Sequence, residues 1–136
     1  MNQTPSVLFV CLHNRCRSRA AEALARRRHP QGRFASAGAS PALEPDEGAR
    51  RALARRGIEL SGPGRALSDV GEAFDWIVTL CDEGLCPAPA ASLGARRLHR
   101  PVADPSARTY ATPQAREAAY EAMLQEIEAL LAEIGL

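Results

Sequence analysis

The stretch VLFVCLHNRCRSRAAE, residues 7–22, decides the fold. It begins with an apolar run, residues 7–10, that is typical of a buried strand in a parallel sheet. From about Ser18 the spacing of apolar residues becomes that of a helix. Between strand and helix lies a loop that starts at Cys11 and holds Arg17 six positions later, a C-x5-R spacing. The sequence therefore predicts a strand, a short loop and a helix in immediate succession.

This loop has the composition of an oxyanion site. A loop between a strand and a helix N-terminus turns successive backbone N–H groups toward a tetrahedral anion. Arg17 adds a planar guanidinium that holds two anion oxygens. The positive end of the helix dipole and Arg17 favour a thiolate at Cys11, at the base of the loop. We expect the anion to be bound by residues 11–18: Cys11, Leu12, His13, Asn14, Arg15, Cys16, Arg17 and Ser18.

Two neighbours support a reactive role for Cys11. Ser18 is placed to donate its hydroxyl to the thiolate, and Asn14 suits the left-handed backbone that such a loop needs. A thiolate beneath an oxyanion is a nucleophile toward phosphorus or arsenic. The alternative is a buried structural cysteine with a surface arginine nearby by chance. The C-x5-R spacing alone is weak evidence, but the strand before it, the helix after it, Asn14 and Ser18 favour the nucleophile.

Length and composition set the broad class of protein. The chain has 136 residues, 46% of them apolar, which predicts one soluble domain over residues 1–136. The net charge of +1 gives no strong attraction to nucleic acid or to membranes. No segment has the roughly 20 apolar residues that span a bilayer, and the first residues lack the pattern of a signal peptide. We therefore expect a cytoplasmic protein, in which four cysteines indicate redox or metal chemistry rather than static disulfides.

The rest of the chain alternates strands and helices. Ser68 is predicted to cap a brief helix. Thr112-Pro113 opens a long last helix, because proline favours the first helical position. The other predicted elements are strands at residues 33–36, 76–80 and 97–99 and a helix at residues 46–56. This order predicts an α/β domain with a parallel sheet, in which ligands bind at the carboxyl ends of the strands. Cys11 and Cys81 both fall at such ends.

A second group of candidate residues lies in IVTLCDEGLCPAP, residues 77–89, which carries Cys81 and Cys86. Two cysteines on a loop form a disulfide if the loop bends. A zinc half-site would need two more ligands; His99 or His13 could serve, although neither lies in a zinc-ligand pattern. Inert buried thiols are the third interpretation, and the residues alone leave all three open.

Asp104-Pro105 supplies a candidate general acid. A carboxylate on a loop after the last strand can reach an anion bound at the sheet edge. Asp-Pro is also a common turn pair, so Asp104 as a plain turn residue is the alternative.

The stretch VLFVCLHNRCRSRAAEA resembles the phosphate loop of the low-molecular-weight protein tyrosine phosphatase superfamily, which includes the thioredoxin-coupled arsenate reductases. The resemblance implies a single three-layer domain with a four-stranded parallel sheet flanked by helices. IVTLCDEGLCPAP resembles the reductases, in which two cysteines follow a VTLC strand and precede a proline; the phosphatases usually lack this pair. In the family a D-P pair supplies the general acid. The phosphatases follow it with aromatic residues, whereas here the first aromatic is Tyr110.

The resemblance implies an arsenate reductase that acts in arsenic detoxification. Arsenate would form an adduct with Cys11 while Asp104 protonates the departing oxygen. A disulfide would then pass from Cys11–Cys81 to Cys81–Cys86, where thioredoxin reduces it. A low-molecular-weight thiol with glutaredoxin or mycoredoxin is an alternative donor that would need only Cys11. The alternative functions are a tyrosine phosphatase that uses Cys11 and Asp104, and a non-enzymatic oxyanion sensor.

The remaining residues of interest are assigned supporting roles. His13 is expected to face solvent. Cys16 is expected to be structural; the alternative is that it is the oxidation partner of Cys11. In some reductases a potassium ion or a plain polar network lies behind the loop, at positions matched here by Asn14, Glu22, Ser36 and Asp69. No other metal and no organic cofactor is expected.

Overall fold

The fold is described from a computed structural model that covers residues 5–82 and 93–136. Cys86 therefore lies outside the described residues. In chain order the elements are β1 (Ser6–Cys11), α1 (Arg17–Arg28), β2 (Arg33–Gly38), α2 (Glu47–Ala54), the 3-10 helix η1 (Leu67–Asp69), β3 (Phe74–Thr79), β4 (Gly94–His99), the 3-10 helix η3 (Pro105–Ala107) and α3 (Pro113–Glu133).

The four strands form one parallel sheet in the order β2-β1-β3-β4. The predicted four-stranded parallel sheet is confirmed. β1 lies between β2 and β3, with Cys11 opposite Gly38 on one side and Val10 opposite Thr79 on the other. The carboxyl end of β1, where the predicted anion loop begins, is therefore flanked by the carboxyl ends of two neighbouring strands.

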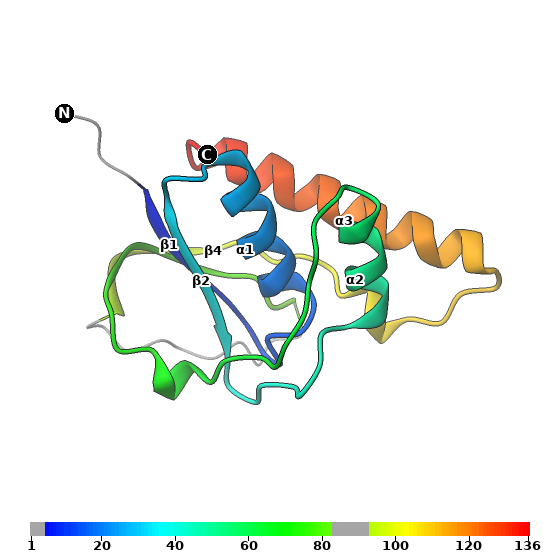
Figure 1. The fold of residues 1–136 in the computed structure, drawn as a ribbon, viewed down its shortest axis with the longest axis horizontal. Helices are drawn as coiled ribbons and strands as arrows, with labels where there is room; N and C mark the ends of the chain where they lie inside the picture. The colour runs from blue at the N-terminus through cyan, green and yellow to red at the C-terminus, as the bar shows by residue number, and fades with distance from the viewer. Residues whose placement is uncertain (1–4, 83–92) are drawn as a thin grey trace.

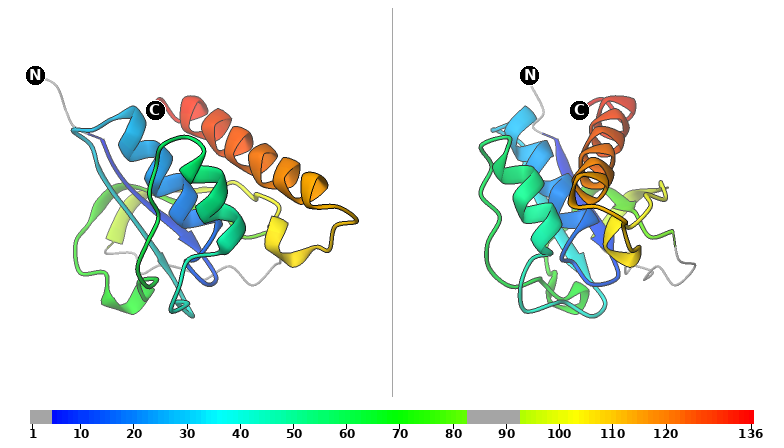
Figure 2. Two further views of the ribbon diagram at one scale, coloured as in Figure 1. Left: turned by 45° about the vertical axis from the view of Figure 1, so that its right-hand side comes forward. Right: turned by 90° about the vertical axis from the view of Figure 1, so that its right-hand side faces the viewer.

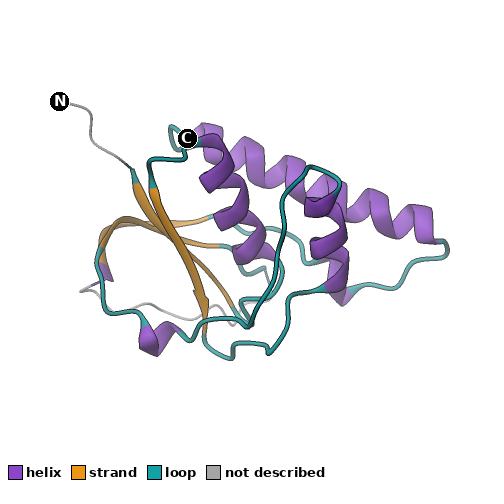
Figure 3. Ribbon diagram, in the orientation of Figure 1, coloured by secondary structure: helices purple, strands orange, loops and turns teal. Residues whose placement is uncertain are grey.

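The three α-helices pack together on one side of the sheet (Figures 1 and 3). Alternate residues of β1 divide the core, as the pleat of a strand requires. Val7 and Phe9 join the cluster that the helices form, whereas Leu8 and Val10 join a second cluster on the other face. Val70, next to η1, belongs to that second cluster, and both views of Figure 2 place η1 apart from the three α-helices.

Side-chain caps explain where two helices begin. Asp46 accepts a hydrogen bond from the backbone N–H of Ala49 at the start of α2, and Thr112 accepts one from Ala115 at the start of α3. Both starts agree with the sequence prediction. The prediction for Ser68 is wrong: Ala66 is the cap position of η1, without a side-chain hydrogen bond, and Ser68 lies inside the element.

The sheet continues by backbone hydrogen bonds beyond the ends of its strands. The N–H of Leu80 donates to the carbonyl of Val10 (2.9 Å), and the N–H of Val102 donates to the carbonyl of Leu80 (3.0 Å). Cys81 thus directly follows a residue that is bonded to β1. Within residues 5–82 and 93–136, no helix has the length and apolarity to cross a membrane.

Candidate active site

The anion loop, residues 11–18, joins β1 to α1. Its carbonyl groups are bound from outside by the segment after β2. Leu12 accepts from the N–H of Ser40 and Arg15 from the N–H of Asp46, both at 2.9 Å, and His13 accepts from Ala42. In a trans peptide the N–H of the next residue points opposite to the carbonyl. The N–H groups that follow these three carbonyls therefore point into the loop, as an oxyanion site requires.

Gly38 makes this close approach of two backbone segments feasible. A Cβ atom at Gly38 would lie 2.7 Å from the carbonyl oxygen of Leu12 and 2.8 Å from the backbone nitrogen of Asn14. Any larger residue would push the anion loop away from β2. The glycine at the end of β2 therefore positions the loop.

A chain of hydrogen bonds runs from the backbone to Cys11. The N–H of Arg65 donates to Oδ1 of Asn14 (2.7 Å), which fixes the orientation of the amide. Nδ2 of Asn14 then donates to Oγ of Ser18 (2.8 Å). Because Ser18 accepts this bond, its own proton is available for Sγ of Cys11, 2.8 Å away. The buried Cys11 sulfur is thus supplied with a donor that stabilises a thiolate.

Asn14 also has the backbone conformation that was expected. Its φ is +46°, and among the described residues no other residue except glycine has a positive φ. Asparagine tolerates this left-handed conformation better than most residues.

Arg17 is buried, and its guanidinium connects the anion loop to the ends of β3 and β4. Nη1 lies 2.9 Å from Oδ1 of Asp82 and also donates to the carbonyls of Leu80 (3.5 Å) and Val102 (3.2 Å). Nη2 lies 3.7 Å from Oδ2 of Asp104. The two predicted polar residues of the site, Arg17 and Asp104, are therefore brought together.

Asp104 precedes η3 and is largely buried, with its side chain 17% exposed. Oδ1 accepts from the N–H of Ser106 (2.9 Å) and from its hydroxyl (2.6 Å). Asp104 is thus a turn residue that caps η3, and its second oxygen still faces Arg17. The two sequence interpretations of Asp104 are compatible in this geometry.

Cys81 is buried at the same sheet edge as Cys11, at the end of the neighbouring strand. The residues on both sides of it, Leu80 and Asp82, contact Arg17. The segment that carries Cys81 therefore lies against the anion loop. The predicted second resolving cysteine, Cys86, is outside the described residues.

Cys16 occupies a different environment from Cys11. Its thiol is buried and lies 3.6 Å from the sulfur of Met123. Burial, together with the carboxylates of Asp46 and Asp104, raises the pKa of the Cys16 thiol. Cys16 is therefore a neutral packing residue, in agreement with the structural role expected for it. His13 is exposed, as expected, with Nδ1 3.2 Å from the carbonyl oxygen of Ser40.

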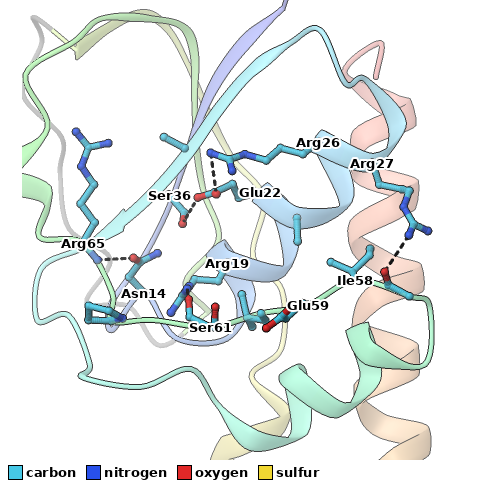
Figure 4. Close-up of a pocket in the computed structure, with 15 residues that line it drawn as sticks. Asn14, Arg19, Glu22, Arg26, Arg27, Ser36, Ile58, Glu59, Ser61 and Arg65 are labelled. Atoms are coloured by element: carbon cyan, nitrogen blue, oxygen red, sulfur yellow. Dashed lines mark hydrogen bonds and ion pairs between the residues drawn. The ribbon is translucent and has the colours of Figure 1, made fainter.

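The residues proposed for potassium do not fit a cation. Glu22, Ser36 and Asn14 line a cavity of about 690 Å³ behind the anion loop. Figure 4 shows these side chains. The hydroxyl of Ser36 donates to Oε1 of Glu22 (2.7 Å), and Oε2 lies 3.2 Å from the guanidinium of Arg26. Arg26 thus already supplies the positive charge. Asp69 is exposed in η1 and does not line this cavity, so the four positions do not form one ligand set.

A zinc site finds no support in the part of the chain that the structure describes. Within it, no three His, Cys, Asp or Glu side chains are grouped so as to hold a metal. Nδ1 of His99 lies 2.7 Å from the hydroxyl of Thr79.

Sequence reasoning missed two residues of the site, Asp82 and Ser106, which contact Arg17 and Asp104 respectively. It placed Arg15 in the anion loop but did not predict that Arg15 donates to Ser106. The available signals were local: Asp82 follows Cys81, and Ser106 stands two residues after Asp104, where a serine commonly bonds an aspartate.

The sequence and the fold of this chain are similar to those of known proteins. Residues 6–134 match the family described as low molecular weight phosphotyrosine protein phosphatase. A search of curated proteins found no match. Among solved structures, the arsenate reductase of Archaeoglobus fulgidus is 32% identical, with a TM-score of 0.77, and the alignment covers 94% of this chain and 97% of that one.

Two more distant structures share the fold. The thioredoxin-dependent arsenate reductase of Corynebacterium glutamicum is 23% identical, with a TM-score of 0.66 over 96% of this chain and 62% of that one. A tyrosine phosphatase of Erwinia amylovora is 21% identical, with a TM-score of 0.63 over 94% of this chain and 93% of that one. Similar structures thus include both reductases and phosphatases.

Proposed function

Since the chain belongs to the low molecular weight phosphotyrosine protein phosphatase family, we propose that it is the family's arsenate-reducing kind. In this proposal Cys11 is the nucleophile and Cys81 and Cys86 carry the disulfide outward to thioredoxin. The observation that carries the proposal is the contact of Arg17 with both neighbours of Cys81. A reductase needs a second thiol beside its anion loop, whereas hydrolysis does not require one.

The first step forms a bond between sulfur and arsenic. Arsenate binds to the inward N–H groups of the anion loop and to Arg17, and the Cys11 thiolate attacks arsenic. The oxygen that leaves carries its own proton and takes a second one from Asp104, so it departs as water. Cys11 then holds a thiol–arsenate adduct, in which arsenic is still pentavalent.

The second step transfers two electrons to arsenic. The Cys81 thiolate attacks the sulfur of Cys11, and the electron pair of the sulfur–arsenic bond stays with arsenic. Arsenite leaves after taking protons from water, and a Cys11–Cys81 disulfide remains. The two thiols have lost two electrons, and arsenic has gained them.

The third step moves the disulfide away from the anion loop. The Cys86 thiolate attacks the sulfur of Cys81, which releases the Cys11 thiolate and leaves Cys81–Cys86. The dithiol of thioredoxin reduces this bond by exchange. The transfer is useful because Cys11 and Cys81 are both buried, so a protein reductant could not reach a disulfide between them.

The test follows arsenate-dependent NADPH oxidation in the presence of thioredoxin and thioredoxin reductase. Cys81→Ser is expected to lose turnover at least a hundredfold while it still binds inorganic phosphate. Cys16→Ala, which removes a buried thiol outside the relay, serves as the matched control and is expected to keep turnover within a few-fold. A Cys81→Ser variant that reduces arsenate at the parent rate would contradict the relay.

A phosphatase is the second candidate function, and the position of Asp104 beside Arg17 supports it as well as it supports the reductase. Cys11 would attack phosphorus while Asp104 protonates the departing phenol, and water would then hydrolyse the phosphocysteine. Such an enzyme would not use Cys81. Hydrolysis of p-nitrophenyl phosphate by the Cys81→Ser variant, with no arsenate reduction by the parent, would establish this second function instead.

A further inference from the structure

We propose that Ser106 is a positioning residue for the general acid Asp104, and that Arg15 of the anion loop holds Ser106 in its place. The inference rests on the proposed function, because it assumes that Asp104 transfers a proton to the departing oxygen. It adds Ser106 to the machinery and gives a second role to Arg15, which was expected only to line the anion loop.

The two oxygens of Asp104 have different partners. Oδ1 receives two hydrogen bonds from Ser106, one from its N–H at 2.9 Å and one from its hydroxyl at 2.6 Å. Oδ2 lies 3.7 Å from Nη2 of Arg17, on the side of the anion loop. Because Oδ1 is occupied by donors, a proton on the carboxyl group belongs on Oδ2. Ser106 thus leaves the oxygen on the side of Arg17 to carry the proton.

The hydroxyl of Ser106 links Asp104 to the anion loop. A serine has one hydroxyl proton, and here Asp104 accepts it. The serine oxygen accepts in turn from Nη2 of Arg15, at 3.2 Å. Arg15 therefore donates to Ser106, and Ser106 donates to Asp104, so the two hydrogen bonds run in one direction.

Arg15 is itself held at a second point. Nη1 lies 3.8 Å from Oδ1 of Asp46, and the carbonyl of Arg15 accepts from the N–H of Asp46 at 2.9 Å. The side chain of Asp46 is buried and caps α2. Arg15 is thus anchored to a rigid helix start and extends from there to Ser106.

This link fixes the distance between the acid and the anion. Asp104 stands on a short connection after β4, where a free carboxyl group could rotate about its side-chain bonds. The chain of contacts makes the anion loop itself hold the acid. The same arrangement serves arsenate and an aryl phosphate, since both need a proton delivered to a departing oxygen.

A double-mutant cycle tests the role of Ser106. Turnover is measured with arsenate and thioredoxin, and with phenyl phosphate, for Ser106→Ala, Asp104→Asn and the double variant. Ser106→Ala is expected to lower kcat about three- to tenfold with KM within twofold, because one hydrogen bond to the acid is lost. Asp104→Asn is expected to lower kcat about a hundredfold. In the Asp104→Asn background the Ser106→Ala change is expected to have no further effect.

Two other variants separate positioning from general damage to the segment. Ser106→Thr keeps the hydroxyl and is expected to restore most of kcat. Tyr110→Phe removes the bond from the Tyr110 hydroxyl to the carbonyl of Pro105 (2.8 Å) without touching Asp104, and is expected to leave kcat within twofold. Should Ser106→Ala fail to fold, Ser106→Cys, a similar side chain with a weaker donor, takes its place in the cycle.

Multiplicative losses for Ser106→Ala and Asp104→Asn in an active enzyme would overturn the positioning role and leave the proposed function standing. A loss with Tyr110→Phe equal to that with Ser106→Ala would also overturn it. A parent protein that turns over neither arsenate nor phenyl phosphate would overturn the proposed function itself.

Discussion

The guanidinium of Arg17 lies 2.9 Å from the carboxylate of Asp82, the residue that follows Cys81. The arginine that would hold the anion is therefore partly neutralised by the segment that carries the proposed resolving cysteine. An anion entering the loop must compete with Asp82 for Arg17, so anion binding and the position of the Cys81 segment are expected to influence each other.

Removing the charge of Asp82 is expected to tighten anion binding. Asp82→Asn keeps the size of the side chain and removes a negative charge next to Arg17, so inorganic phosphate should bind about threefold more tightly or better. Isothermal titration calorimetry measures the change. Asp69→Asn, at an exposed carboxylate away from the anion loop, is the control and should have no effect. Weaker binding by Asp82→Asn would show that orientation of Arg17 matters more than charge.

The backbone of Asn14 offers a test of strain that is separate from its hydrogen bonds. Asn14→Gly and Asn14→Ala both lose the amide that contacts Ser18 and Arg65. Only alanine is disfavoured at a φ of +46°, so Asn14→Ala should be about 1 kcal/mol less stable than Asn14→Gly. Urea unfolding compares the two variants. Equal stability would mean that the loop changes conformation once the amide is gone.

Gly48 tests the packing of α2 against α3. A Cβ atom there would overlap the ring of Tyr120, which is buried. Alanine normally stabilises a helix relative to glycine, by about 1 kcal/mol. For Gly48→Ala we expect the opposite sign. The free energy of unfolding should fall by about 1–3 kcal/mol, because the ring of Tyr120 must move. Gly71→Ala, where a Cβ meets nothing within 4 Å, should be neutral in the same urea experiment.

Much of the fold follows from local sequence signals. The apolar run before Cys11 predicts β1, and Thr112-Pro113 predicts the start of α3, which the structure confirms. These signals are reliable because they depend on neighbours in the chain: strand periodicity, a capping side chain and the fixed φ of proline. The C-x5-R spacing locates the anion loop for the same reason.

The contacts between loops could not be predicted in this way. Ser106 is 91 positions from Arg15, and Asp82 is 65 positions from Arg17. Each pair meets because parallel strands bring their carboxyl ends to one edge of the sheet, and no pattern in the sequence states which side chains then touch. The partner of Glu22 was also missed: Arg26 stands one turn later on α1 and neutralises it, which removes the reason for a potassium ion.

Stability is expected to fall in alkaline solution because of Cys16. Burial raises the pKa of the Cys16 thiol in the folded protein above its value in the unfolded chain. The contribution of the neutral thiol to the free energy of unfolding is therefore complete below about pH 9 and is lost as the pH rises further. The free energy of unfolding should then decrease by up to about 1.4 kcal/mol per pH unit from this group. Burial and the Asp46 carboxylate raise the pKa of Tyr120 as well, which acts in the same direction.

Cys16→Ala isolates the contribution of the thiol. The variant has no group to ionise at this position, so its free energy of unfolding should fall less steeply between pH 9 and 10.5 than that of the parent. Urea unfolding at several pH values measures both slopes. Parallel slopes would show that Cys16 ionises as easily in the folded protein as in the unfolded one.

The measurement that bears most directly on the proposed relay is peptide mapping by mass spectrometry after a single turnover of arsenate, with no reductant present. We predict one disulfide per chain that joins Cys81 to Cys86, and a Cys11–Cys81 disulfide that accumulates instead in a Cys86→Ser variant. Protein that has formed one equivalent of arsenite but keeps Cys81 as a thiol, with Cys11 oxidised to another partner, would contradict it.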